Sequence, residues 1–390
     1  MSDTVIGQTP PRLLPAEPPR AIAGYDSAPW NRRLRQQFLQ SLRAHSLFIV
    51  MVVTYVVAGW LTPRLTGVAV PFSPDLYSTK LFVLTAAFLV VTGIGYLAYI
   101  MIAVRPAQLL CYLGASLRDR VVVLDRLWTA LPVFLLLPLL MSTFTYFKFL
   151  IPYVRPFTFD HTFAQWDRSL HLGYEPWELL QPILGYPLVS AVVNSIYNLW
   201  LFVLFGVLLW QSFSLARPRL RMRYLISFVL IWILLGHVAA TLLSSAGPVY
   251  YGRVTGLGDP FAPLMAYLHQ VDQAIPLPAL VVQEMLWHSY ANRDLGVGSG
   301  ISAMPSLHVA TSFSFALLGF AIRRWLGILF VAFVAAIMVG SVHLGWHYAI
   351  DGYVAIVGTW AIWWMVGWFL DWPMVARLLW GDRTAAAARH

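Results

Sequence analysis

The chain has 390 residues, of which 59% are apolar and only 11% are charged. A soluble domain carries charge on about a quarter of its residues, so this composition excludes a soluble globular protein and predicts a membrane protein. The net charge of +9 does not indicate nucleic-acid binding, because the basic residues cluster in short stretches between apolar windows. The lone Cys111 excludes an intramolecular disulfide and argues against a cysteine-based metal site.

The first segment, residues 1–44, is polar and precedes every apolar window. Residues 1–28 are rich in proline and small residues, and we expect them to be disordered, without a cleavable signal sequence. The stretch from Pro29 to Ala44 is basic and amphipathic. It is compatible with a helix lying on anionic lipid headgroups and equally with a solvated helix that leads into the membrane.

Eight apolar windows follow, each close to the length of about twenty residues that spans a bilayer. They cover residues 46–62, 81–104, 127–147, 188–212, 224–244, 304–322, 325–342 and 348–370. We therefore predict an all-α polytopic fold with about eight transmembrane helices. The first two windows, within residues 45–124, are separated from the other six, which lie within residues 125–375, and residues 376–390 form a tail.

Arginines between the windows predict the orientation. They fall in the second, fourth and sixth connections, for example at Arg105, Arg217 and Arg323. Basic connections remain in the cytoplasm, so both termini should be cytoplasmic and the odd-numbered connections should face outward, in a plasma (inner) membrane protein. The long outer connections, residues 160–187 and 246–302, mix aromatics, acids and prolines, and we expect interfacial helices there that cap a site.

Two short motifs carry the chemistry, each in apolar surroundings where ionisable residues are costly. In Pro305-Ser306-Leu-His308, proline and serine predict the first turn of a helix whose free N–H groups can bind an anion. His347 and Asp351 are four apart and would share a helix face, so the carboxylate could fix the imidazole tautomer and leave the other nitrogen free to attack. The alternative is that these residues only join helices by buried hydrogen bonds.

The fourth window holds three polar residues on one helix face, Asn194, Tyr197 and Asn198. Polar groups in such a helix should face the bundle. They could bond neighbouring helices together or line a cavity for a lipid headgroup, and we favour the first role.

The two histidine motifs together resemble motifs two and three of the type-2 phosphatidic acid phosphatase superfamily, nearest its inositol phosphorylceramide synthase and sphingomyelin synthase branch. That branch shortens the third motif as here, in His347-Tyr-Ala-Ile-Asp351, and Ser341 occupies the position of the usual arginine. The resemblance covers residues 125–375 and implies a six-helix core. It also implies that His347 is the nucleophile, Asp351 its orienting partner and His308 the acid for the leaving group.

The resemblance also implies cationic contacts to phosphate. The family's first motif, Lys-x6-Arg-Pro, is spelled by Lys148-Phe-Leu-Ile-Pro-Tyr-Val-Arg155-Pro156, but at the end of the first core helix instead of the third. At the expected place lie Tyr250, Tyr251 and Arg253, and Arg253 could also be a surface charge among headgroups. The candidate phosphate-binding residues are Ser306, Lys148, Arg155, Arg253 and Tyr251. Ser306 could cap the helix, hold phosphate, or do both.

The activity that the resemblance implies is transfer of a phospho-headgroup between membrane lipids through a phosphohistidine, with a small alcohol or a lipid as acceptor. If water is the acceptor, the enzyme is instead a lipid or polyprenyl phosphate phosphatase. Neither reaction needs a metal or another cofactor. Two other classes stay open: a metal-dependent phosphotransferase, because His343, His347 and Asp351 have the spacing of half a metal site, and a non-catalytic lipid-binding protein.

Overall fold

The computed structural model describes residues 30–68, 70–116 and 124–381. Within these ranges every regular element is helical, and no strand occurs. The predicted disorder of residues 1–28 lies outside the described residues, as does the end of the predicted tail beyond residue 381.

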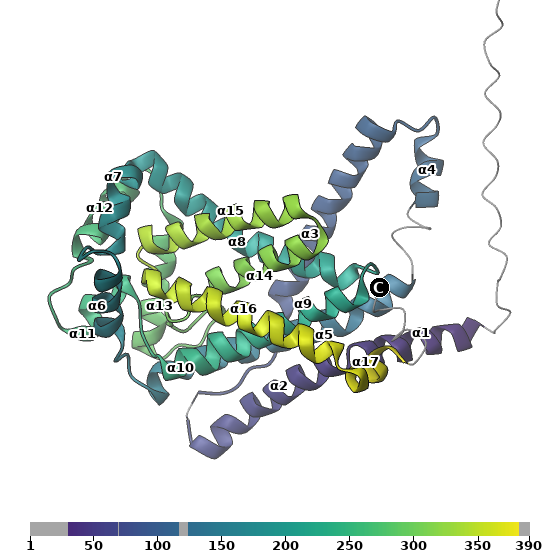
Figure 1. Cartoon of the computed structure of the whole chain (residues 1–390), viewed down its shortest axis with the longest axis horizontal. Helices are drawn as coiled ribbons and strands as arrows, with labels where there is room; N and C mark the ends of the chain where they lie inside the picture. The colour runs from purple at the N-terminus through teal and green to yellow at the C-terminus, as the bar shows by residue number, and fades with distance from the viewer. Residues whose placement is uncertain (1–29, 69, 117–123, 382–390) are drawn as a thin grey trace, which may run out of the picture.

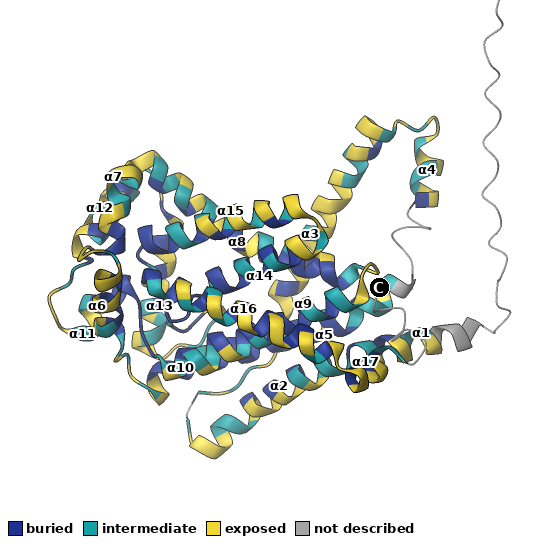
Figure 2. Ribbon diagram, in the orientation of Figure 1, coloured by how far each residue is buried: buried dark blue, intermediate teal, exposed yellow. Residues whose placement is uncertain are grey.

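The first part of the chain forms helices that lie on or beside the main bundle. They are α1 (Trp30–Ala44), α2 (Ser46–Thr66), α3 (Ser78–Tyr99) with its π-helical continuation η1 (Ile100–Val104), and α4 (Leu109–Ser116). Helix α2 packs on α5, whereas α3 and α4 project away from the bundle (Figure 1). Apolar residues are exposed along most of α3 (Figure 2). A helix that is apolar all round and exposed is suited to a lipid environment.

The bundle itself contains the long helices that follow. They are α5 (Leu124–Val154), α8 (Pro187–Phe213), α9 (Pro218–Leu230) continued by η3 (Ile231–Ala239) and α10 (Ala240–Leu242), α14 (Leu307–Ile322), α15 (Arg324–His343) and α16 (Ala349–Asp371). Helix α14 lies between α15 and α16 (Figure 1). Most of its residues from Val309 to Gly319 are buried, so it forms the centre of the core.

Seven helices among the described residues are long and apolar enough to cross a membrane. The eighth predicted window is α14, which has only 16 residues. Each predicted window therefore corresponds to one helical segment, and the prediction of an all-α polytopic membrane protein is confirmed. The division of the chain into two extra helices, a core and two tails stays a prediction.

Short helices gather at one end of the bundle (Figure 1). They are α6 (Asp160–Leu170), α7 (Pro176–Leu184), η4 (Pro248–Tyr250), α11 (Tyr251–Thr255), α12 (Ala262–Ala274) and α13 (Pro278–Asn292). They come from the two long connections that the sequence marks as capping segments. At the opposite end, α17 (Pro373–Trp380) packs against α1, where the guanidinium of Arg43 donates to the carbonyls of Arg377 and Leu378.

Candidate active site

The first motif begins helix α14. Ser306 is its N-cap, with extended backbone angles, and its hydroxyl accepts a hydrogen bond from the backbone N–H of Val309 (3.4 Å). The prediction that Pro305 belongs to the first turn is wrong, because the cap follows the proline and the helix begins at Leu307. His308 does lie in the first turn.

The ring of His308 is held between two aromatic residues of α8. Its centroid lies 4.0 Å from that of Trp200 and 4.7 Å from that of Tyr197, which stacks on it. These contacts fix the ring plane, so His308 has a defined orientation at the cavity wall.

The second motif begins helix α16, and one prediction about it is wrong. His347 does not share a helix face with Asp351, because α16 begins at Ala349 with Tyr348 as its N-cap. The two side chains meet because Asp351, in the first turn, reaches back toward the residues before the helix. Its Oδ2 accepts from the backbone N–H of Tyr348 (3.1 Å) and lies 3.2 Å from Nδ1 of His347. A carboxylate at this position also suits the positive end of the helix dipole.

This contact has a chemical consequence for His347. With Nδ1 donating to Asp351, the lone pair of His347 is on Nε2, on the far side of the ring from the carboxylate. Burial lowers the pKa of His347, so the imidazole is neutral near pH 7. A neutral, oriented imidazole is the form that can act as a nucleophile.

The two histidines face each other. Their ring centroids are 6.0 Å apart and the rings are nearly edge-to-face. A backbone hydrogen bond from the N–H of Ser306 to the carbonyl of Asp351 (3.2 Å) ties the starts of α14 and α16 together. The relative position of His308 and His347 is therefore set by main-chain structure.

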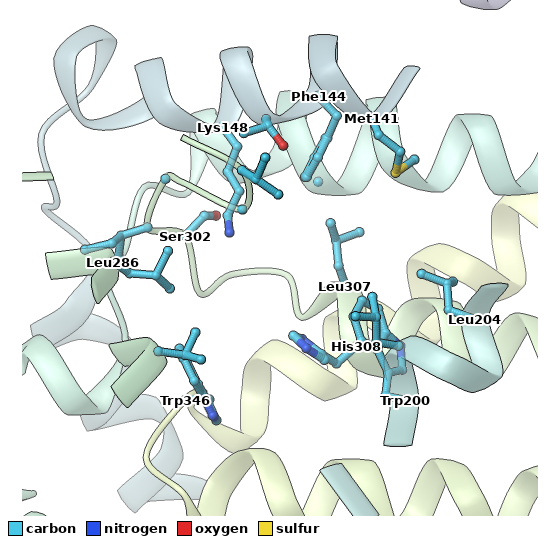
Figure 3. A pocket seen from close by; sticks show the side chains of 18 of the residues that line it. Met141, Phe144, Lys148, Trp200, Leu204, Leu286, Ser302, Leu307, His308 and Trp346 are labelled. Carbon is cyan, nitrogen blue, oxygen red and sulfur yellow. The ribbon is translucent and has the colours of Figure 1, made fainter. Parts of the chain in front are cut away.

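Both histidines line a cavity of about 600 Å³. Lys148 of α5 also lines it and reaches into it, with Ser302 close by and His308 and Trp346 across the cavity (Figure 3). The ammonium of Lys148 has no hydrogen bond or ion pair with any described residue. One end of the cavity thus carries the histidines and a free cation. The remainder is lined mainly by apolar and aromatic side chains of α3, α5, α8 and α13, together with Lys80, Thr145 and Asn198. A pocket of this size and lining suits a ligand with a large apolar part.

Four predicted phosphate-binding residues, Ser306 among them, lie outside the cavity lining. The guanidinium of Arg253 forms two hydrogen bonds to the carboxylate of Glu284 (2.8 and 2.9 Å). Arg155 lies over the ring of Phe159, 5.0 Å from its centroid. The Tyr251 hydroxyl is hydrogen-bonded to His161 (2.9 Å). The structure therefore brings Lys148 together with the histidines but not Arg155, Tyr251 or Arg253.

Two buried aspartates of α6 hold the second motif in place. Asp167 accepts hydrogen bonds from the backbone N–H groups of Ala349 (2.6 Å) and Ile350 (2.9 Å), at the start of α16. Asp160 accepts from the hydroxyl of Tyr348 (2.8 Å). Burial raises the pKa of Asp167 to about 6, while the two backbone hydrogen bonds act in the opposite direction.

Asp160 also accepts hydrogen bonds from the loop that precedes η4. It accepts from the backbone N–H groups of Ala246 (2.9 Å) and Gly247 (2.8 Å). Gly247 has a φ of +101°, and a Cβ there would lie 2.6 Å from the carbonyl oxygen of Trp346. Only glycine allows this close approach, so the loop and the segment before His347 are packed backbone to backbone.

The possible metal site does not assemble. Nε2 of His343 is hydrogen-bonded to the hydroxyl of Ser190 (2.9 Å) instead of joining His347 and Asp351. Within the described ranges, no group of three or more histidine, cysteine, aspartate or glutamate side chains is placed to hold a metal ion.

The polar residues of α8 divide between the two roles considered for them. Asn194 accepts from the backbone N–H of Ala279 (3.2 Å) and so joins α8 to α13, whereas Tyr197 and Asn198 line the cavity. Lys80, at the start of α3, also lines the cavity and was not predicted. The only signal for it is a lysine at the edge of an apolar window, which by itself predicts no more than an interfacial charge.

The fold and this site define a class: an integral membrane protein whose paired histidines and lysine face a cavity suited to a lipid phosphoester. A family model described as the PAP2 superfamily matches residues 161–365, or 205 of the 390 residues. The chain belongs to this superfamily, whose members are phosphatases and phosphotransferases of lipid phosphoesters. No curated protein and no solved structure matches the chain. The synthase-like branch stays a prediction.

Proposed function

We propose that the protein is a lipid phosphotransferase that moves a phospho-headgroup from one membrane lipid to an alcohol or a second lipid through a phosphohistidine on His347. The observation that carries this proposal is the arrangement of His347, bound through Nδ1 to Asp351, opposite His308 and in one cavity with Lys148.

The proposed reaction has two balanced steps. Nε2 of His347 attacks phosphorus, the bond from phosphorus to the leaving oxygen breaks, and protonated His308 gives that oxygen its proton. The acceptor hydroxyl then attacks the phosphohistidine and gives its proton to His308, and the bond between phosphorus and His347 breaks. With a lipid phosphomonoester as donor and water as acceptor, the same steps release inorganic phosphate and the enzyme is a phosphatase.

Lys148 supplies the charge that the family's third motif lacks here. Ser341, at the position of the missing arginine, is buried and its hydroxyl donates to the carbonyl of Met338. The backbone carbonyl of Ser341 accepts hydrogen bonds from the N–H groups of Trp346 and His347. Ser341 therefore stabilises the turn that precedes α16. Negative charge on the phosphoryl oxygens must be balanced by a cation. The unpaired ammonium of Lys148 lines the cavity and can take the place of the missing arginine. Ser306, Arg155 and Tyr251 remain predicted phosphate contacts, whereas Arg253 is paired with Glu284 and is not assigned this role.

The cavity and the arginines support the placement in the membrane. The apolar walls from α3, α5 and α8 can hold a lipid tail while the phosphate lies between the histidines. The arginine-bearing turns at Arg217 and Arg323 lie at the end of the bundle away from α6 and α7 (Figure 1). With basic turns inside, the histidines face the extracytoplasmic side of a plasma membrane.

The test uses purified protein in detergent with EDTA. It is offered lipid phosphomonoesters and lipid phosphodiesters, each with and without an alcohol acceptor, and the products are separated. A lipid carrying the transferred headgroup is the expected product. Free phosphate from a monoester alone would make the protein a phosphatase. Activity that returns only with a divalent cation would contradict the metal-free phosphohistidine route.

His308 has its own test. If it protonates the leaving oxygen, His308→Ala should lose less activity on a nitrophenyl phosphate ester, whose leaving group needs no proton, than on a lipid ester. Equal losses on the two substrates would contradict the acid role.

A further inference from the structure

A second cavity, of about 400 Å³, lies at the other end of the bundle, away from the histidines. It is enclosed by α1, the start of α5, the connection between α8 and α9, the first turns of α9, and α17. The polar residues of its lining are Gln37, Gln40, Ser41, His45, Thr129, Ser214 and Arg221. Among the residues that the structure describes, no acidic residue is part of this lining.

Arg221 is the charged group of this cavity. Its side chain belongs to α9, and the residue is only 4% exposed. Nη2 donates to Nε2 of His45 (2.8 Å), whereas Nε and Nη1 have no hydrogen-bond partner among the described residues. A buried guanidinium with two unpaired donors and no carboxylate beside it is costly unless an anion binds there.

His45 does not supply a compensating charge. Its Nδ1 donates to the carbonyl of Ser41 (2.8 Å), so its Nε2 is the acceptor of the bond from Arg221 and the ring is neutral. The nearby carboxylate of Asp371 is engaged by Arg219. The positive charge of Arg221 is therefore not neutralised by either group.

We infer that this cavity binds a phosphate group, carried either by an anionic lipid headgroup or by free phosphate. The guanidinium is the group best suited to phosphate oxygens, and here two of its donors are open. Side chains of Gln37, Thr129 and Ser214 provide neutral hydrogen-bonding groups around it. Basic pockets between transmembrane helices are favourable sites for lipid headgroups.

Such a ligand would connect parts of the chain that are far apart in sequence. It would contact α1, α5, α9 and α17, which come from both ends of the chain. A ligand that binds only the folded protein raises its thermal stability by an amount that grows with the ratio of ligand concentration to Kd. Stability is therefore a readout of this site that does not depend on catalysis.

The experiment compares delipidated protein in a maltoside detergent with the same protein after addition of phosphatidylglycerol, of a neutral galactolipid, or of inorganic phosphate. The Tm is measured in each case, and bound lipid is counted by native mass spectrometry. We expect phosphatidylglycerol or phosphate to raise Tm by several degrees and the galactolipid to have no such effect. A rise with phosphatidylglycerol alone identifies a headgroup, and a rise with inorganic phosphate identifies the free anion.

Three variants test the residue assignment. Arg221→Gln should lose the rise in Tm and the bound phosphate or lipid, while Arg35→Gln, an exposed arginine of α1, should keep both. Thr129→Phe leaves Arg221 in place and fills the cavity, so it should also lose the rise in Tm and the bound ligand. It therefore tests the site even if Arg221→Gln does not fold. The inference would be overturned if Arg221→Gln or Thr129→Phe bound as much phosphate or lipid as the wild type. It would also be overturned if the galactolipid raised Tm as much as phosphatidylglycerol does.

Discussion

The two ends of the bundle each have a cavity with an incompletely paired cation and a histidine, yet they are arranged for different purposes. At one end, Nδ1 of His347 lies against Asp351, and the proposed reaction takes place on Nε2. At the other, both nitrogens of His45 are occupied, by Ser41 and Arg221. A free cation is thus sufficient for binding an anion. Covalent chemistry requires in addition an imidazole with one nitrogen fixed and the other open.

A second difference concerns the acids. Beside the catalytic motif, Asp160 and Asp167 are buried and their oxygens accept hydrogen bonds from backbone N–H groups. Around Arg221, no carboxylate from the described part of the chain lines the cavity. A buried charge that is hydrogen-bonded to a loop fixes the position of that loop, whereas a buried charge without a partner can bind a ligand. The following predictions, from the largest expected effect to the smallest, test this distinction.

Removing the free imidazole should abolish catalysis. His347→Ala is expected to lower kcat by at least about 10⁴-fold while the protein stays folded, because no other group at the site can form the intermediate. His288→Gln, at an exposed imidazole of α13 outside both cavity linings, is the control and should keep kcat within about threefold of the wild type. A His347→Ala enzyme that retains turnover would contradict the assignment.

Asp167→Asn should lower kcat by about 10- to 100-fold with a smaller change in KM, because Asp167 positions His347 without touching the substrate. Its amide presents one oxygen in place of the two that bind the N–H groups of Ala349 and Ile350. The matched control is Asp294→Asn, at an exposed residue away from α16. A larger effect on KM than on kcat would argue for direct substrate contact instead.

Lys148→Gln should lower kcat/KM by about 100-fold, the usual effect of removing one charge-stabilising donor. Arg253→Gln should change it by less than about threefold, because that guanidinium is already paired with Glu284 at the surface. Kinetics on the same lipid phosphoester separate the two variants. If Arg253→Gln proves the more damaging, the phosphate is bound by Arg253 and not by Lys148.

The smallest effect concerns Glu175, a buried acid beside the site, whose carboxylate has no hydrogen-bond partner among the described residues and lies 3.6 Å from Nε of Arg168. Burial raises its pKa to about 7. Because the folded state then holds a proton that the unfolded chain loses near pH 4.5, stability should fall as pH rises from about 4.5 to about 7. Glu175→Gln should raise Tm by about 3 °C at pH 8 and very little at pH 4. An equal change at both pH values would contradict this cause.

The sequence predicts those features that depend on neighbouring residues. Apolar windows predict the helices, and Ser306 predicts the start of α14, because both signals depend only on neighbouring residues. The sequence alone does not decide whether Lys148 or Arg253 contacts phosphate. The position of Lys148 in the cavity depends on how α5 packs against α13 and α14. The pairing of Arg253 with Glu284, 31 residues away, has no local signature.

His347 shows a subtler limit. Its spacing from Asp351 is equally consistent with a shared helix face and with a capping arrangement. The helix begins two residues after the histidine because Asp351 and Asp167 both accept hydrogen bonds at that start. Asp167 is 182 residues away from Ala349, so the helix boundary is decided by tertiary structure.

Helix α3 contributes Lys80, Leu81 and Leu84 to the wall of the catalytic cavity, although most of its surface is exposed. A chain shortened to begin at residue 124 would keep His308, His347 and Lys148 but would leave that wall open to the bilayer. In the proposed reaction, bond formation and selection among lipid tails thus depend on separate stretches of the chain. Under that proposal, substitutions in α3 change which lipids are accepted and leave His308, His347 and Lys148 in place.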